Sequence, residues 1–158
     1  MTNAPKVNPA SITTDGCHRY AVRVYYEDTD AGGVVYYANY LRYAERARTE
    51  ALREAGIPHA ELVEQFGLMF MVRRVEVDYV RAARLDDSLI VETETTEVGG
   101  ATVRLRQVVI GPDGPCAELI LRLACVRTDG ATKPGRIPPR WREGLGRLRT
   151  RDADRTGG

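Results

Sequence analysis

Three carboxylates and a glycine pair stand directly before a predicted helix, and these residue types could together act on a carbonyl group. Glu27, Asp28 and Asp30 interrupt an alternating apolar pattern, and Gly32 and Gly33 follow them. An ionised carboxylate can attack a carbonyl carbon or take a proton from water. Free N–H groups at a helix N-terminus can bind the oxyanion that then develops. Spacing alone also allows a second interpretation, in which the aspartates form Asx-turns and the glycines only turn the chain.

The periodicity of the apolar residues predicts the elements that must position this motif. Apolar residues alternate with polar ones over residues 19–26, which is typical of a strand. Over residues 40–55 they recur at helical spacing, and Gly56 followed by Pro58 ends the helix. A short second helix is predicted over residues 60–66. The motif therefore lies between a strand and a long helix.

Four further strands are predicted without a helix between them, at residues 69–80, 88–98, 102–110 and 116–128. Their short connections force neighbouring strands to run antiparallel. One long helix and about five strands predict an α+β fold of two layers. A single helix rich in alanine covers only part of such a sheet, so we expect the chain to form a homo-oligomer.

Several motifs of the sequence resemble one known family. They are residues 28–36 (DTDAGGVVY), 39–40 (NY), 45–50 (ERARTE), 77–79 (VDY) and 83–87 (ARLDD). Together they resemble the hotdog-fold acyl-CoA thioesterases, in the branch that is associated with the Tol-Pal envelope system and related to 4-hydroxybenzoyl-CoA thioesterase. The resemblance extends from residue 23 to residue 126. It implies an antiparallel five-stranded sheet wrapped around one long central helix, and hydrolysis of a short-chain or aromatic acyl-CoA.

The resemblance also implies roles for individual residues. Asp30 corresponds to the catalytic carboxylate of the family, and the backbone N–H of Tyr37 corresponds to the group that polarises the thioester carbonyl. Asp28 and Gly33 would support the turn. Glu45 either pairs with a neighbouring arginine on the helix surface or orients the water. One departure is that this chain has Tyr37 where the Tol-Pal-associated branch usually has histidine, so no histidine role is carried over.

Binding of CoA requires groups that pair with its phosphates. No nucleotide-binding glycine motif is present. Arginine suits phosphate because its guanidinium can donate two parallel hydrogen bonds. Five arginines near predicted strand ends are therefore candidates, without a choice among them: Arg73, Arg74, Arg81, Arg84 and Arg104.

Composition limits the other classes of function. Twenty-three basic and 22 acidic residues give a formal charge of +1, which predicts no nucleic-acid partner. No apolar run is long enough to span a bilayer. Three cysteines without metal-like spacing predict free thiols in the cytoplasm and no metal. The family resemblance implies no cofactor beyond the CoA thioester, which is the substrate. The two histidines, His18 and His59, have no acid or nucleophile at a recognisable offset, and we expect both at the surface.

The chain divides into three predicted segments. Residues 1–16 read as a flexible leader, residues 17–132 as the hotdog thioesterase domain, and residues 133–158 as a basic, proline- and arginine-rich tail that is mobile. By resemblance, hotdog domains pair edge strands into dimers with active sites at the subunit interface, and often form tetramers.

Two other functions stay open on the sequence alone. The chain could be a non-catalytic subunit that binds acyl-CoA or an acyl carrier protein. It could also be another hotdog enzyme, a hydratase or dehydratase. The dehydratases that resemble this fold use a histidine near the acid, and the sequence has none near Asp30, which favours the thioesterase.

Overall fold

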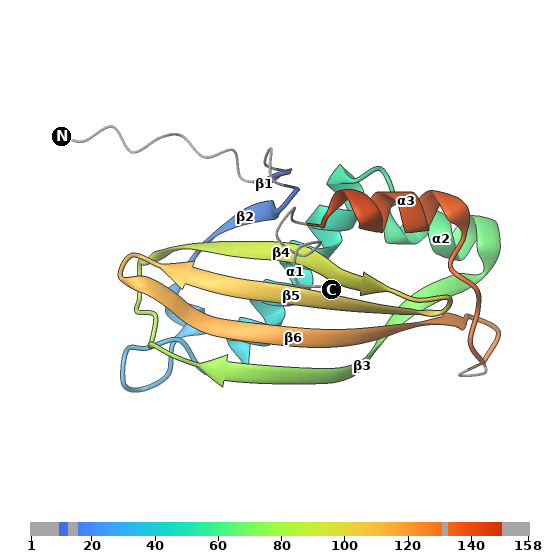
Figure 1. The fold of residues 1–158 in the computed structure, drawn as a ribbon. Helices are drawn as coiled ribbons and strands as arrows, with labels where there is room; N and C mark the ends of the chain where they lie inside the picture. The colour runs from blue at the N-terminus through green and yellow to red at the C-terminus, as the bar shows by residue number, and fades with distance from the viewer. Residues whose placement is uncertain (1–9, 13–15, 131–132, 150–158) are drawn as a thin grey trace.

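Within the part of the chain that the structure describes, six strands form one antiparallel sheet in the order β1-β2-β4-β5-β6-β3 (Figure 1). The computed structural model describes residues 10–12, 16–130 and 133–149 of the 158. The strands are β1 (Ala10–Ile12), β2 (His18–Arg23), β3 (Leu68–Tyr79), β4 (Ser88–Val98), β5 (Thr102–Gly111) and β6 (Gly114–Arg127). The helices are α1 (Asn39–Glu54), α2 (His59–Phe66) and α3 (Pro139–Arg147), and a 3₁₀ turn, η1, spans Tyr26–Asp28.

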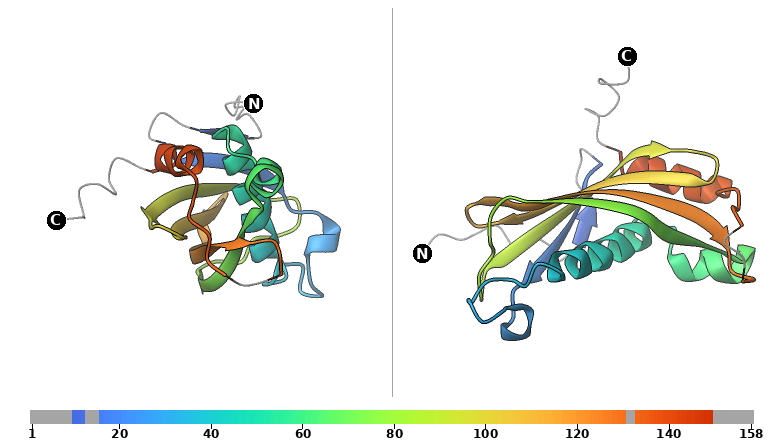
Figure 2. Two further views of the ribbon diagram at one scale, coloured as in Figure 1. Left: turned by 90° about the vertical axis from the view of Figure 1, so that its right-hand side faces the viewer. Right: turned by 90° about the horizontal axis from the view of Figure 1, so that it is seen from below.

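Helix α1 lies along one face of this sheet because its apolar residues fall on one side of the helix (Figure 2). The facing sheet residues are alternate apolar positions, which include Val91, Leu105 and Leu121. Alanines in α1 let the helix backbone approach these side chains closely. The buried face of α1 includes two tyrosines and three alanines, Tyr40, Tyr43, Ala44, Ala47 and Ala51.

The predicted α+β class with an antiparallel sheet is confirmed, and five of the strands lie close to their predicted positions. The first of these is shorter than expected. We expected it to reach Tyr26, but β2 ends at Arg23 and Tyr26 begins η1. The reason is local, because the Tyr25 N–H donates a hydrogen bond to Asp28 Oδ2 at 2.9 Å and closes the turn.

The prediction of a flexible leader over residues 1–16 is wrong for Ala10–Ile12. These residues form β1, which pairs antiparallel with β2 in a register that sets Ala10 opposite Tyr20. An added strand satisfies the backbone N–H and C=O groups that an outermost β2 would leave unpaired. Residues 1–9 and 13–15 lie outside the described residues.

The prediction of a surface His18 is also wrong. His18 begins β2 opposite Thr93 of β4, and its side chain is fully buried. Burial lowers the pKa of this imidazole, and the carboxylates of Glu54 and Glu50 oppose that shift. His18 is therefore part of the packed interior between β2 and α1, whereas His59 is exposed as expected.

The prediction that residues 133–158 form a mobile tail is wrong for the segment up to Arg149. Pro139–Arg147 form α3, whose Trp141 and Leu145 are each 1% exposed. Ile137 and Leu148 extend the same buried stripe, and their spacing from Trp141 and Leu145 is that of one helix face. Arginine and proline dominate the composition of this segment, so the helical spacing of its four buried apolar residues is hard to recognise in the sequence. Residues 150–158 lie outside the described residues.

The arginines of this C-terminal segment are also bound in the structure. Arg140 donates to the Gly56 carbonyl at 2.7 Å and pairs with Glu61 of α2 at 2.7 Å. Arg147 donates to the Ala55 carbonyl. The last carbonyls of a helix have no partner within the helix, so cations at this end satisfy them and complement the helix dipole. The arginine-rich segment thus caps the C-terminal end of α1.

Strand β3 is the outermost strand on the side of the sheet opposite β1. It runs for 12 residues, and one edge pairs with β6 through a register shift between Val72 and Arg74. Val72 and Tyr79 remain exposed on this strand, at 45% and 49%.

None of the described helices is long and apolar enough to cross a membrane.

Candidate active site

Asp30 sits in a tight turn that leaves one of its carboxylate oxygens available. Its Oδ1 accepts a hydrogen bond from the Gly32 N–H at 2.8 Å, which is an Asx-turn, and its carbonyl accepts the Gly33 N–H at 3.1 Å. Gly33 has φ of +76°, a conformation that favours glycine. Among the described residues no hydrogen-bond donor reaches Asp30 Oδ2, and the side chain is exposed. Asp30 can therefore form the Asx-turn through Oδ1 and still offer Oδ2 to a substrate.

A small hairpin then returns the chain from Asp30 to the start of α1. The Asp30 N–H donates to the Val34 carbonyl at 2.9 Å, and the Tyr36 N–H donates to the Asp28 carbonyl at 2.9 Å. The same Asp28 carbonyl accepts the side-chain amide of Asn39, the first residue of α1, at 2.8 Å. These bonds hold the acidic motif beside the N-terminal end of the helix, as the strand–loop–helix interpretation requires.

The main-chain N–H of Tyr37 lies at this helix start without an acceptor among the described residues. Helix α1 has no side-chain N-cap, and no hydrogen bond from the Tyr37 N–H is found in the same part of the chain. The Tyr37 carbonyl accepts a bond from the Tyr79 hydroxyl at 3.2 Å, and the two rings meet edge to face with centroids 6.2 Å apart. Tyr79 ends β3, so the helix start is fixed against the edge strand. The Tyr37 ring itself is 61% exposed.

Asp28 lies in the turn that precedes the Asp30 hairpin. Its carboxylate closes η1 through the Tyr25 N–H. Burial raises the pKa of the Tyr43 hydroxyl, and the nearby Asp28 carboxylate raises it further. Asp28 therefore faces the interior at the turn, whereas Asp30 faces outward.

Glu45 lies away from Asp30 in the same chain. It is on α1, six residues after Asn39, which is roughly 9 Å further along the helix axis. Its carbonyl accepts the Thr49 hydroxyl at 3.1 Å, and its side chain is exposed. Burial lowers the pKa of the nearby Arg48, and the Glu45 carboxylate opposes this shift without forming an ion pair with Arg48. Within one chain, the structure does not bring Glu45 to the Asp30 turn.

The five candidate arginines are all exposed, and two of them, Arg74 and Arg104, line one pocket together on the outer part of the sheet. Arg74 pairs with Glu76, and Arg104 pairs with Glu97 at 3.7 Å. The backbone of Arg84 forms a bridge with Val34 in the hairpin. Arg84 is therefore attached directly to the Asp30 hairpin. Of the other two, Arg81 donates to the Asp113 carbonyl and Arg73 lies at the register shift in β3.

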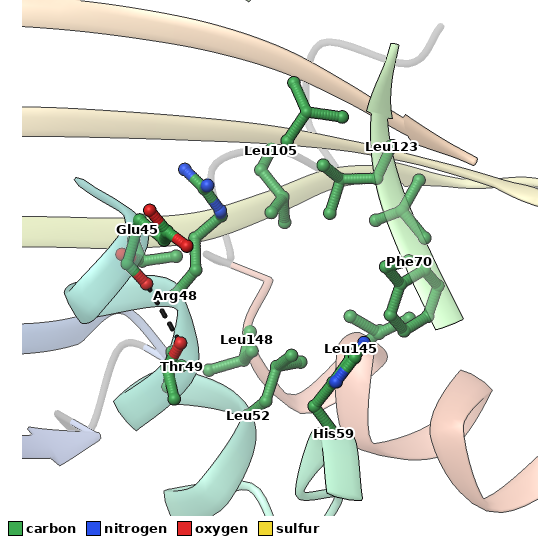
Figure 3. Close-up of a pocket in the computed structure, with 14 residues that line it drawn as sticks. Glu45, Arg48, Thr49, Leu52, His59, Phe70, Leu105, Leu123, Leu145 and Leu148 are labelled. Carbon is green, nitrogen blue, oxygen red and sulfur yellow. Dashed lines mark hydrogen bonds between the residues drawn. The ribbon is translucent and has the colours of Figure 1, made fainter. Parts of the chain in front are cut away.

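A cavity of about 240 Å³ lies further along α1, and the sequence did not predict it (Figure 3). It lies between α1, the sheet, α2 and α3, and it is partly open, since Thr49 and His59 in its wall are exposed. Most of its wall is hydrocarbon, including Leu52, Phe70, Leu105, Leu123 and Leu145. Its polar wall consists of Glu45, Arg48, Thr49, His59 and Thr93.

One buried polar group organises the polar side of this cavity. Gln107 is fully buried on the helix-facing side of β5. Its Nε2 donates to the Ala44 carbonyl and to Thr93 Oγ1, each at 2.9 Å, and its Oε1 accepts the Arg48 guanidinium at 3.0 Å. A glutamine at an inward position among Val103, Leu105 and Val109 is the signal in the sequence that could have indicated this site.

Comparison with known proteins identifies the family. Residues 32–118 match the model of the Thioesterase superfamily. The chain belongs to this superfamily. Among its relatives, acyl-CoA thioesterase YbgC of Haemophilus influenzae is 46% identical over 124 residues, which cover 78% of this chain and 90% of that protein. Acyl-CoA thioester hydrolase YbgC of Escherichia coli is 45% identical over 95 residues, 60% of this chain and 70% of that protein.

A solved structure agrees with these relatives. The probable thioesterase of Bartonella henselae superposes with a TM-score of 0.72 and 33% identity, covering 77% of this chain and 99% of that one. The resemblance to hotdog thioesterases that rests on residues 28–36 and the later motifs is thus confirmed. The roles of Asp30 and Tyr37 within the family stay predictions.

Proposed function

We propose that this protein hydrolyses the thioester of a short-chain or aromatic acyl-CoA to the free acid and CoA. The observation that carries the proposal is the pairing of two groups in one hairpin of a thioesterase-superfamily chain. These groups are the exposed Asp30 carboxylate, with Oδ2 free among the described residues, and the unbonded Tyr37 N–H at the start of α1. Relatives named acyl-CoA thioesterase support the substrate class.

The chemistry assigns one step to each group. The Tyr37 N–H donates to the thioester carbonyl oxygen and stabilises the charge that develops there. The Asp30 carboxylate either attacks the carbonyl carbon to form a mixed anhydride or takes a proton from the attacking water. In the anhydride route, water then cleaves the anhydride and regenerates the Asp30 carboxylate. In both routes the CoA thiolate leaves, and net hydrolysis consumes one water molecule. The Asx-turn from Gly32 orients the carboxylate without using Oδ2.

The active unit in this proposal is a homodimer joined along β3. A 12-residue outer strand with exposed Val72 and Tyr79 offers an unpaired edge. A twofold axis that pairs two copies of β3 antiparallel sets the Tyr79 end of one strand beside the Phe70 end of the other. Because Tyr79 contacts Tyr37 and Phe70 lines the cavity, each Asp30 hairpin would then face the cavity of the other subunit.

The remaining partner assignments follow from position and composition. Arg84 is the CoA phosphate ligand we favour, because its backbone adjoins the hairpin that holds Asp30. Cys116 and Cys125 are buried and form no disulfide, which supports a reducing, cytoplasmic location. Assembly of dimers into a tetramer, and delivery of the acyl group by an acyl carrier protein, stay predictions.

The test is a coupled thiol assay on purified protein over a panel of acyl-CoAs that vary in chain length and include benzoyl-CoA. A thiol reagent detects the CoA that hydrolysis releases. We expect turnover of several short or aromatic substrates and its loss in Asp30→Asn. Glu64→Gln, which also replaces an exposed acid by its amide but on α2, is the matched control. Saturable binding without thiol release would identify a non-catalytic acyl-CoA binding subunit instead.

A further inference from the structure

The Arg48 guanidinium is held at an apolar cavity, and no carboxylate of the described residues forms an ion pair with it. Its one hydrogen bond among the same residues goes to Gln107 Oε1, at 3.0 Å. Burial lowers the pKa of Arg48, and the exposed Glu45 carboxylate partly opposes this shift. The other polar groups that face the cavity, on α1, β4 and α2, are Thr49, Thr93 and His59.

The Arg48 guanidinium is not needed to hold α1 against the sheet. Gln107 already joins the two layers, because its Nε2 bonds to the Ala44 carbonyl of α1 and to Thr93 of β4. Removing a cation from water costs free energy unless a counter-charge or several hydrogen bonds compensate it. Gln107 supplies one uncharged acceptor, and the exposed Glu45 carboxylate at the same cavity forms no ion pair with the guanidinium. The guanidinium therefore retains donors for a further acceptor at the edge of the cavity.

The wall opposite Arg48 suits a hydrocarbon chain. Leu105, Leu123 and Phe70 face the cavity from three strands, and Leu145 and Leu148 close it from the C-terminal segment (Figure 3). In the same view Arg48 and Glu45 lie together at the α1 side. A ligand that fills this space would bury methylene groups against the leucines and could present an oxygen to Arg48.

The cavity is too far from Tyr37 to serve the same chain with a short acyl group. Eleven residues separate Tyr37 from Arg48, which is roughly 16 Å along a helix. In the β3 dimer of the proposed function, the hairpin of one subunit lies beside the cavity of the other. An acyl group held at one hairpin can therefore enter the cavity of the other subunit.

On the basis of that proposed function, we infer that the cavity receives the acyl group and that Arg48 selects acyl groups with a carboxylate at the end remote from the thioester. The apolar wall holds the methylene chain, and the guanidinium donates charge-assisted hydrogen bonds to the terminal carboxylate. The substrate class is therefore short dicarboxylic acyl-CoAs, in preference to monocarboxylic acyl-CoAs of equal length. Arg48 acts as a specificity-determining residue and takes no part in the hydrolytic step.

The experiment compares glutaryl-CoA with pentanoyl-CoA, which have the same number of acyl carbons and differ in the terminal carboxylate. In the wild-type protein we expect kcat/KM for glutaryl-CoA to exceed that for pentanoyl-CoA by at least about tenfold, the effect of one charge-assisted hydrogen bond. In Arg48→Met the ratio should reverse, because methionine keeps apolar volume and removes the charge. Arg48→Lys should retain part of the preference.

Controls separate selection from general damage. Arg46→Met replaces an exposed arginine on the same helix and should leave the substrate ratio unchanged. Thermal unfolding of each variant reports whether the fold survives. If Arg48→Met does not fold, the wild-type ratio and the Arg48→Lys ratio still decide, since a wild-type protein that does not prefer glutaryl-CoA overturns the inference by itself.

Calorimetry with the two corresponding non-hydrolysable thioether analogues distinguishes this inference from the proposed function. Tighter binding of the carboxylate analogue, lost in Arg48→Met, supports selection by Arg48 even if neither thioester is hydrolysed, and in that case the proposed hydrolysis is wrong. Hydrolysis of both thioesters at equal kcat/KM, with equal analogue affinities, leaves the proposed function in place and overturns the role of Arg48.

Discussion

The two ends of α1 differ in what surrounds them. At the N-terminal end, Asp30 and Tyr37 are exposed, and local hydrogen bonds of the hairpin hold them. At the C-terminal end, α2 and α3 cover the helix, and Arg140 and Arg147 bind the carbonyls that follow it. A reacting carboxylate must remain open to substrate and water, whereas a cavity wall is built from side chains that several elements pack together. The two ends of α1 thus meet different requirements. Substitutions at the N-terminal end should lower turnover, and substitutions at the C-terminal end should lower stability.

Asp30→Asn should produce the largest effect, and it should alter chemistry alone. Asparagine Oδ1 can still accept the Gly32 N–H, so the turn should survive. The loss of the ionised oxygen should lower kcat by at least roughly 10² to 10³, comparable to the loss of one oxyanion donor. Steady-state kinetics measures kcat, and thermal unfolding should give an unchanged Tm. Near-normal turnover, with deamidation to aspartate excluded by mass, would remove Asp30 from the mechanism.

Trp141→Ala should have the converse effect at the other end of α1. Trp141 is 1% exposed and packs edge to face on Phe66 with ring centroids 5.5 Å apart. Truncation of a buried tryptophan lowers the free energy of unfolding by about 3–5 kcal/mol. Urea unfolding measures this change. Arg140→Ala, beside it and half exposed, should cost less than about 1 kcal/mol. Equal, small effects of the two variants would mean that α3 does not contribute to the folded core.

A mixed dimer would show whether the two ends act together across subunits. Thr49 is exposed and borders the cavity, so Thr49→Trp should obstruct it. Neither Asp30→Asn nor Thr49→Trp should be active alone. A heterodimer of the two, isolated with two different tags, should regain about half of wild-type activity, since one of its two sites combines an intact Asp30 with an open cavity. A site contained within one subunit predicts no recovery.

Tyr37→Phe should have the smallest effect, because it removes a hydroxyl and keeps the main-chain donor. The Tyr37 ring is largely exposed, and its carbonyl rather than its hydroxyl receives the bond from Tyr79. We expect a change in kcat/KM below about tenfold, mostly in KM. Tyr37→His tests the residue that the Tol-Pal-associated branch usually carries. A large gain in kcat for that variant would show that a histidine there assists the chemistry.

Local signals allowed much of the fold to be predicted. Apolar periodicity located α1 and the long strands β3 to β6 because each of these elements buries one face along much of its length. It did not locate β1, since three residues are too few to show a period. It did not locate α3 either, because the spacing of Ile137, Trp141 and Leu145 is hidden among arginines and prolines.

The candidate site was predicted only in part. The acidic motif and the helix start are close in the chain, so Asp30 and Tyr37 could be proposed together. Arg48 lies in a charged stretch of the helix, so the sequence predicts an exposed side chain. The sequence gives no sign that this side chain is partly buried. Its partner Gln107 is 59 residues away, and only the packing of β5 against α1 brings the two together.

The sequence by itself determined the family, the α+β class and the order of strand, acidic turn and helix, because these depend on contiguous motifs and on one-dimensional periodicity. The tertiary structure decided which charged groups are exposed and which are buried. It places Arg48 at the cavity, leaves Asp30 open and sets the tail arginines on the carbonyls at the end of α1. The physical reason is that burial and hydrogen-bond satisfaction depend on residues from distant elements, which no single stretch of sequence contains.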